Sequence, residues 1–266
     1  MARRIIFLAG VLFTISLVCG VIQVNVYVGG TINGYMPFFN KSEFANSAIH
    51  NFQVVFENVG SVGCDTRLRA DIYNSNNDLV YTAWSRGFPL EPGDVADMNA
   101  YWHPREAGNY TANLSVYYCN LILNGPVFNV SVQNRTTSIE EKNTTEDLLD
   151  IKYETTRNYV EMRIKPKEDL ESIVIIPKEY PLGWMFSSTR VDSLKKDNEK
   201  IVKIDYNPTI WKESRVDFDI ISTDGNLYLT KSVEIKEKKE LPIEHIIIAF
   251  LSIVIIILLI IIFRLK

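Results

Sequence analysis

Histidine and cysteine are scarce in this sequence, with only three of each among 266 residues. The histidines, which are the usual bases at neutral pH, are His50, His103 and His245. The chain contains no G-x-S-x-G elbow, no H-E-x-x-H motif, no phosphate-binding glycine loop and no Cys/His cluster with metal-ligand spacing. We therefore expect a protein that is not an enzyme, with no catalytic residues, no cofactor and no metal site.

Basic patches interleaved with aromatic residues are also missing, and the formal net charge is -4. This balance argues against a nucleic acid partner. The turn at Asn76–Asp78 has too few oxygen ligands for a recognisable calcium loop, so we interpret it as turn chemistry. Asp217 and Asp219 fall on one strand face, where we expect both to be solvated, and their pairing alone does not indicate a glycosidase.

Long apolar runs occur at both ends of the chain. Arg3 and Arg4 precede an uncharged stretch that ends at Ile22, which is the pattern of an export signal. We predict that residues 1–20 are a signal peptide, or an uncleaved signal anchor, because the run is nearly long enough to span a bilayer. At the other end, residues 246–263 carry no charge, and roughly 18 residues at 1.5 Å each cover about 27 Å of hydrocarbon.

These ends predict the location of the protein. We expect a transmembrane helix at 241–263, contacting membrane lipid, and a cytosolic tail at 264–266 that contains Arg264 and Lys266. Lysines on the other flank weaken the charge argument for this orientation, but the N-terminal export signal favours it. The protein would then be a single-pass protein of the cell membrane, with its body outside the cytoplasm and its C-terminus in the cytosol.

Two features of the body agree with export. Composition alone predicts roughly two or three N-x-[ST] sequons, whereas the chain has six candidate glycosylation sites, at Asn40, Asn109, Asn113, Asn129, Asn134 and Asn143. Cys19 falls in the apolar leader, which leaves Cys64 and Cys119 as an even pair in the body. An oxidising compartment favours a disulfide between them. His103 would need a free Cys64 to form a catalytic pair, so we prefer the structural interpretation of both residues.

Apolar residues in the body recur with a period of two. Short alternating runs bounded by Gly, Asn or Pro predict strands, which we place near residues 22–28, 52–56, 68–72, 79–84, 95–102, 110–118 and 128–132. The asparagines at 109, 113 and 129 fall on the polar sides of their strands. No helical period is evident between the two ends. Strands at this spacing predict an antiparallel β-sandwich over residues 21–133.

This region also resembles a known family. Phe56-x-Asn58-x-Gly60, Leu90-x-Pro92-Gly93, Trp102-x-Pro104 and Gly108-x-Tyr110 occur in the order and rough spacing seen in CARDB-like (cell-adhesion-related) domains. The resemblance extends over about residues 50–133. It implies an immunoglobulin-like sandwich that is usually non-enzymatic and belongs to surface proteins of bacteria and archaea. These positions are turn and packing positions, so the resemblance transfers no binding residues.

A polar, sequon-bearing stretch at 134–148 predicts a linker. Beyond it, strands are expected near residues 151–155, 159–164, 172–176, 201–206, 216–221 and 227–235, which predict a second immunoglobulin-like sandwich over 149–240. The alternative is one domain built from both halves. The fold class is therefore all-β, with two antiparallel sandwiches and a C-terminal transmembrane helix.

Two functions remain open at this stage. The first is a membrane-anchored structural, adhesion or interaction protein of the cell surface, whose partner is a surface protein or a glycan. The second is an accessory subunit of a membrane-associated assembly, such as a secretion, pilus or transport complex. Some aromatic residues could form a binding surface, but we favour core positions for them; they are Tyr27, Trp84, Tyr101, Trp184 and Trp211.

Overall fold

The computed structural model describes residues 30–44, 47–133, 148–181, 183–208 and 213–236. These residues form strands, turns and bends, which confirms the all-β prediction for this part of the chain. No helix among them has the length and apolar character needed to cross a membrane. Several predicted segments lie outside the described residues: the leader at 1–20, the strand near 22–28, the linker apart from Leu148, and the C-terminal helix with its tail.

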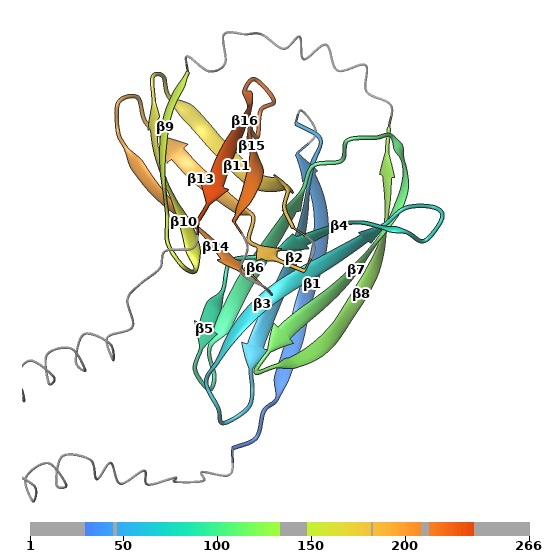
Figure 1. Cartoon of the computed structure of the whole chain (residues 1–266). Coiled ribbons are helices and arrows are strands. Elements are labelled where there is room, and N and C mark those ends of the chain that lie inside the picture. The colour runs from blue at the N-terminus through green and yellow to red at the C-terminus, as the bar shows by residue number, and fades with distance from the viewer. Residues whose placement is uncertain (1–29, 45–46, 134–147, 182, 209–212, 237–266) are drawn as a thin grey trace, which may run out of the picture. The chain divides into compact units, whose positions relative to one another are not determined.

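The first sandwich contains two antiparallel sheets, in which β1-β2-β6 face β4-β3-β7-β8 and the short β5 pairs with β3 (Figure 1). Its strands are β1 (Gly34–Phe44), β2 (Ile49–Asn58), β3 (Cys64–Tyr73), β4 (Leu79–Trp84), β5 (Phe88–Leu90), β6 (Val95–Trp102), β7 (Gly108–Tyr118) and β8 (Leu121–Val132). This division of strands between two sheets is the immunoglobulin-like arrangement.

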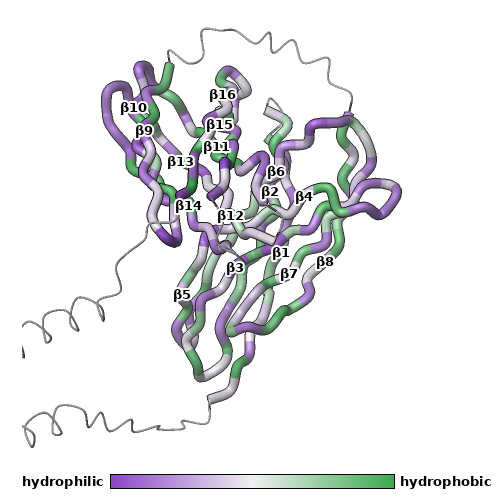
Figure 2. Tube along the Cα trace, in the orientation of Figure 1, coloured by the Kyte–Doolittle hydropathy of each residue, from purple (hydrophilic) through white to green (hydrophobic). Residues whose placement is uncertain are grey.

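Side chains that alternate between buried and partly exposed positions along strands such as β2 build the core of the first sandwich. Phe52, Val54 and Phe56 of β2 are fully buried, whereas the residues between them are partly exposed. The same alternation of apolar and polar residues can be followed along other strands of the chain (Figure 2). Because side chains of a strand point to opposite faces in turn, a strand with this alternation places one face in the core and the other in solvent.

The second sandwich has the sheets β12-β14-β10-β9 and β13-β11-β15-β16. Its strands are β9 (Leu149–Thr155), β10 (Tyr159–Pro166), β11 (Leu170–Glu179), β12 (Met185–Phe186), β13 (Thr189–Leu194), β14 (Lys200–Asn207), β15 (Ser214–Ser222) and β16 (Tyr228–Ile235). The two sandwiches share one topology, because β9-β10-β14 repeats β1-β2-β6 and β13-β11-β15-β16 repeats β4-β3-β7-β8.

A third apolar cluster joins the two sandwiches, which belong to one compact unit that begins at Ile32. Ile49 and Tyr101 of the first sandwich pack with residues of β11 and β15 in the second, namely Val174, Ile176 and Ile221. A backbone hydrogen bond also joins the two sandwiches, because the Ser188 amide donates to the Trp84 carbonyl at 2.8 Å. We call this contact region, between β4 and β6 on one side and β11 to β15 on the other, the junction.

Several strands differ from those expected. β1 was not predicted, because GYMPFFNKSEF lacks a period of two and contains a proline. The sequence also did not predict β5, β12 and β13. β5 and β12 are very short, and apolar and polar residues do not alternate regularly in β13. Asp219 was expected to be solvated, but it is only 4% exposed. The first sandwich packs against the second near this strand, so a position that alternation assigned to solvent is covered.

Candidate functional site

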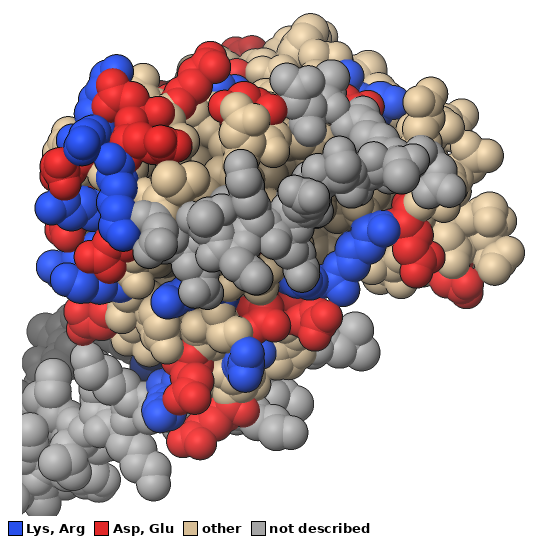
Figure 3. Space-filling view, turned by 90° about the horizontal axis from the view of Figure 1, so that it is seen from above, with Lys and Arg blue, Asp and Glu red and all other residues tan. Residues whose placement is uncertain are grey.

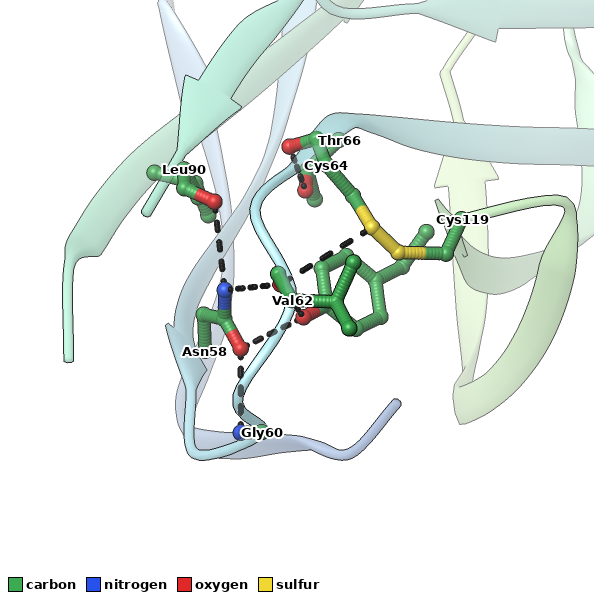
Figure 4. Close-up of a disulfide and its surroundings, with 8 residues drawn as sticks. Asn58, Gly60, Val62, Cys64, Thr66, Leu90 and Cys119 are labelled. Carbon is green, nitrogen blue, oxygen red and sulfur yellow. Dashed lines mark hydrogen bonds between the residues drawn. A yellow bond between two sulfur atoms is a disulfide. The ribbon is translucent and has the colours of Figure 1, made fainter. Parts of the chain in front are cut away.

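The predicted cysteine pair lies at one end of the first sandwich. Cys64 begins β3, Cys119 follows β7, and a disulfide joins them with a Cα–Cα distance of 5.2 Å (Figure 4). Cys119 and Asn120 form the two-residue turn between β7 and β8, with φ values of 48° and 64°. A turn with positive φ at both central residues matches the twist of the strands that it connects.

Asn58 organises the chain beside this disulfide (Figure 4). Its side chain is fully buried and donates to the carbonyls of Val62, at 2.9 Å, and Leu90, at 3.1 Å. Its Oδ1 accepts from the Gly60 amide at 3.0 Å and from the Tyr118 hydroxyl. One residue of the family-like pattern thus fixes the turn that leads into Cys64. Asn58 is structural here and offers no group to a ligand.

Four of the six sequon asparagines lie in described strands, and all four are exposed. Asn40 belongs to β1, Asn109 and Asn113 to β7, and Asn129 to β8. The positions leave room for a glycan on each side chain, while the occupancy of the sites stays a prediction. Asn134 and Asn143 lie outside the described residues.

The candidate catalytic and metal-binding residues that the structure describes do not lie together as a catalytic group. Cys64 is bonded to Cys119 and is therefore not a free nucleophile for His103. Among the described residues, no group of three His, Cys, Asp or Glu side chains is placed to hold a metal ion. In the turn at 74–78, the Asn74 side chain accepts from the amides of Asn76 and Asp78, as expected of turn chemistry. His245 lies outside the described residues.

Two adjoining hollows at the junction are the candidate binding site. The first has a volume of about 1010 Å³ and the second of about 640 Å³. Trp84, Gly183 and Met185 line both, so the hollows meet at these three residues. We call them together the junction groove. Residues of both sandwiches contribute to it, and therefore neither sandwich alone would form it.

Polar contacts between the sandwiches fix the walls of the groove. The Tyr81 hydroxyl donates to the Pro177 carbonyl at 2.7 Å, and the Tyr180 hydroxyl donates to the Thr82 carbonyl at 2.8 Å. Burial raises the pKa of Tyr81 well above its usual value and that of Tyr180 to about 12. Both phenols therefore stay protonated at physiological pH and keep donating these bonds.

Charged groups of both signs surround the groove. The Arg69 guanidinium donates to Asp71 at 2.8 Å and lies 5.4 Å from the ring centre of Trp84. At the rim, Arg105 pairs with Glu179 at 3.2 Å across the junction. Acidic and basic side chains are also interspersed on the face shown in Figure 3. The groove therefore presents aromatic surface with paired charges instead of a field of one sign.

Asp219 is the most buried charge near the groove. Its carboxylate accepts from the Thr230 hydroxyl at 2.9 Å and lies 3.9 Å from both His103 Nδ1 and Lys178 Nζ. Burial by itself raises the pKa of Asp219, but the interactions with His103, Thr230 and Lys178 outweigh burial and lower it. The carboxylate is therefore ionised at neutral pH and lies between a side chain of each sandwich, His103 of the first and Lys178 of the second.

The aromatic residues for which we favour core positions over a binding surface separate into two groups. Tyr101 and Trp184 are each only 6% exposed, in agreement with core positions. Trp84 is partly exposed and lines both hollows. Tyr27 and Trp211 lie outside the described residues. One sequence feature did point to the junction: the uninterrupted apolar run Ile173–Ile176, which is typical of a strand covered on both faces.

Comparison with known proteins gives no family. No family model matches the sequence, and neither does any curated protein. Among solved structures, the chaperone DraB of E. coli is 9% identical with a TM-score of 0.28, and the match covers 77% of this chain and 98% of that one. A BSP domain of a biofilm-associated protein is 8% identical with a TM-score of 0.27, over 86% of this chain and 55% of that one.

A transglutaminase of red sea bream is a further match, at 10% identity and a TM-score of 0.25. The match covers 75% of this chain but only 31% of the transglutaminase. With TM-scores this low, none of the three matches supports an argument about activity or partners. The resemblance to CARDB-like domains has no support from these comparisons.

Proposed function

We propose that this protein is a membrane-anchored interaction protein of the cell surface, with the two sandwiches outside the cytoplasm. The observation that carries the proposal is the charge-free run at 246–263, which is long enough to span a bilayer as a helix. The disulfide of Cys64 and Cys119 supports an oxidising compartment. The four described sequon asparagines are exposed and therefore accessible to glycosylation, as the proposal requires.

The junction groove is the surface that we propose for the partner, a protein or glycan of the cell envelope. Aromatic side chains and paired charges in a hollow between domains are common features of binding sites. In the described residues the core of each sandwich is filled by apolar side chains, so we place the partner at the groove and propose binding in place of catalysis.

The test is capture of partners from cell-surface extracts with the full-length protein in mild detergent. Arg105→Glu reverses a half-exposed charge at the rim of the groove, and Arg163→Glu reverses a similarly exposed charge on β10 as a control. We expect a partner that binds the wild type and the control but is lost with Arg105→Glu. Repeated recovery of nothing, or equal recovery by both variants, contradicts the proposal.

An accessory subunit of a larger membrane assembly is the second candidate. The observation in its favour is the exposed apolar triplet Leu121, Ile122 and Leu123 at the start of β8, where the exposed fractions are 54%, 55% and 37%. Exposed apolar clusters of this kind suit protein contact. In native electrophoresis under mild detergent, migration at the mass of the monomer would remove this candidate.

A further inference from the structure

The two sheets of the first sandwich have four edge strands: β4 and β6 belong to the junction, and β1 and β8 are the other two. Within the described residues, β1 pairs only with β2, and β8 pairs only with β7. An open edge presents unpaired N–H and C=O groups that can pair with a strand of another molecule. The two edges lie together, because the rings of Phe39 and Phe128 are 6.3 Å apart and the Lys41 ammonium donates to the Asn129 carbonyl at 3.0 Å.

Part of each edge has its own protection. The register of β1 shifts between Tyr35 and Phe38, where Pro37 lies, and the register of β8 shifts at residues 125–126, where Pro126 lies. A bulge bends the edge and a proline cannot donate to a new strand, so both devices discourage pairing. The regular runs Phe38–Phe44 and Val127–Val132 have neither device. Lys41 and Glu43 add charge to the later part of the first run, and charge also opposes pairing, so the apolar residue at the start of each run is the part left open.

The regular run of each edge has an exposed apolar residue and a sequon on its outer face. Phe38 and Asn40 pair with Val55 and Gln53, which alternate with the buried Val54, so both side chains point away from the core. Phe38 is 48% exposed.

The arrangement on β8 is the same. Val127 and Asn129 pair with Asn113 and Thr111, which alternate with the buried Ala112. Val127 is 61% exposed. On both edges the sequon asparagine therefore follows the exposed apolar residue by two positions, on the same face.

We propose that N-linked glycans at Asn40 and Asn129 cover the open edges and prevent the sandwich from pairing, edge to edge, with a second copy of this chain. A glycan is bulky and strongly hydrated, so it covers the apolar residue beside it and blocks the approach of another strand. One glycan would stand on the outer face of each sheet, on either side of the contact between Phe39 and Phe128. This inference rests on the export proposed above.

The test uses the full-length protein, produced in a host that glycosylates exported proteins and purified in mild detergent. Ser42→Ala and Ser131→Ala remove the two edge sequons while keeping both asparagines, and both serines are exposed. Thr111→Ala removes the sequon of Asn109 on the inner strand β7 and is the control, because Asn109 pairs with Ser131 and not with Val127. Peptide mass spectrometry reports which sites carry glycans, and sedimentation velocity reports the oligomeric state.

We expect glycans at Asn40 and Asn129 and a monomeric wild type and control. The double variant should dimerise at least tenfold more tightly. Adding Phe38→Lys and Val127→Lys to the double variant should restore the monomer, because charged edge residues oppose pairing. This rescue distinguishes edge pairing from misfolding.

Two results would overturn the proposal: a double variant that remains monomeric, as it would if another segment of the chain covered the edges, or a wild type without glycans at Asn40 and Asn129. Glycans at Asn109 or Asn113 alone would leave export intact while removing this inference. The absence of all glycans, combined with inaccessibility to protease added outside intact cells, would remove both proposals.

Discussion

Asn58 is a polar residue in a buried position, and its side-chain amide has four partners: Gly60 and Val62 in the turn before Cys64, Leu90 of β5 and Tyr118 of β7. Replacing it with Leu keeps the approximate volume but removes the side-chain donor to the Leu90 carbonyl and the acceptor of the Gly60 amide, while the Val62 carbonyl keeps the Tyr118 hydroxyl at 3.1 Å. Buried groups that lose their partners are costly.

We expect Asn58→Leu to lower the free energy of unfolding by about 2 to 4 kcal/mol, as measured by chemical denaturation. Gln53→Ala is the control, because it removes an exposed hydrogen bond to Asp97 and should cost less than about 1 kcal/mol. Equal effects of the two substitutions would show that the Asn58 network contributes little.

Asp219 makes the stability of the junction dependent on pH. Its pKa is lowered in the folded protein, so its contribution is complete above the ordinary pKa of about 3.9 and is lost as the pH falls through the lowered value. Asp219→Asn retains the shape of the side chain and removes the charge.

We expect this variant to be less stable at pH 7 by about 1.5 to 3 kcal/mol, the range for hydrogen bonds to charged groups. The difference from the wild type should shrink below about pH 4. Urea titrations across this pH range provide the measurement, with the exposed Asp150→Asn as control. A difference that is constant with pH would contradict the role assigned to the charge.

At the scale of elements, the disulfide links the start of β3 to the hairpin of β7 and β8 across a sequence separation of 55 residues. On the chain-entropy model, a loop of this length is worth about 4 kcal/mol. We expect the Cys64→Ala, Cys119→Ala double variant to lose about this amount. Reductant should destabilise the wild type comparably and leave the variant unchanged. A loss below about 1 kcal/mol would show that the bond constrains the unfolded chain little.

The alternation of apolar and polar residues in the sequence predicted the strands that have one face in a core and one in solvent. β2, β3 and β7 are such strands, since their buried residues occur at every second position. β1 escaped prediction because an edge strand with a bulge and a proline needs no regular alternation. Tertiary contacts, which are not local in sequence, make it a strand.

The junction escaped prediction for a related reason. In β11, Ile173 and Ile175 pack in the core of the second sandwich, while Val174 and Ile176 pack against the first. The apolar run indicated that both faces are covered but not what covers them. The disulfide partners were accessible to prediction because only two cysteines lie in the body, whereas the groove requires two sandwiches to be brought together.

At the scale of the whole molecule, the junction should couple the two sandwiches into one cooperative unit. Val174 is fully buried there, and Val174→Asp would place a charge in the apolar cluster. We expect calorimetry to show one unfolding transition for the wild type and two for this variant. Ile201→Asp changes a residue that is 56% exposed and should leave the single transition intact. Two transitions in the wild type would contradict coupling.

We propose that the two sandwiches lie outside the cytoplasm on a membrane anchor. The most direct measurement is protease digestion of intact cells that express the full-length protein with a cytosolic C-terminal tag, compared with digestion after lysis. The account predicts that protease outside intact cells removes the body and leaves a short tagged fragment in the membrane. A chain that stays full-length in intact cells but is digested after lysis would contradict it.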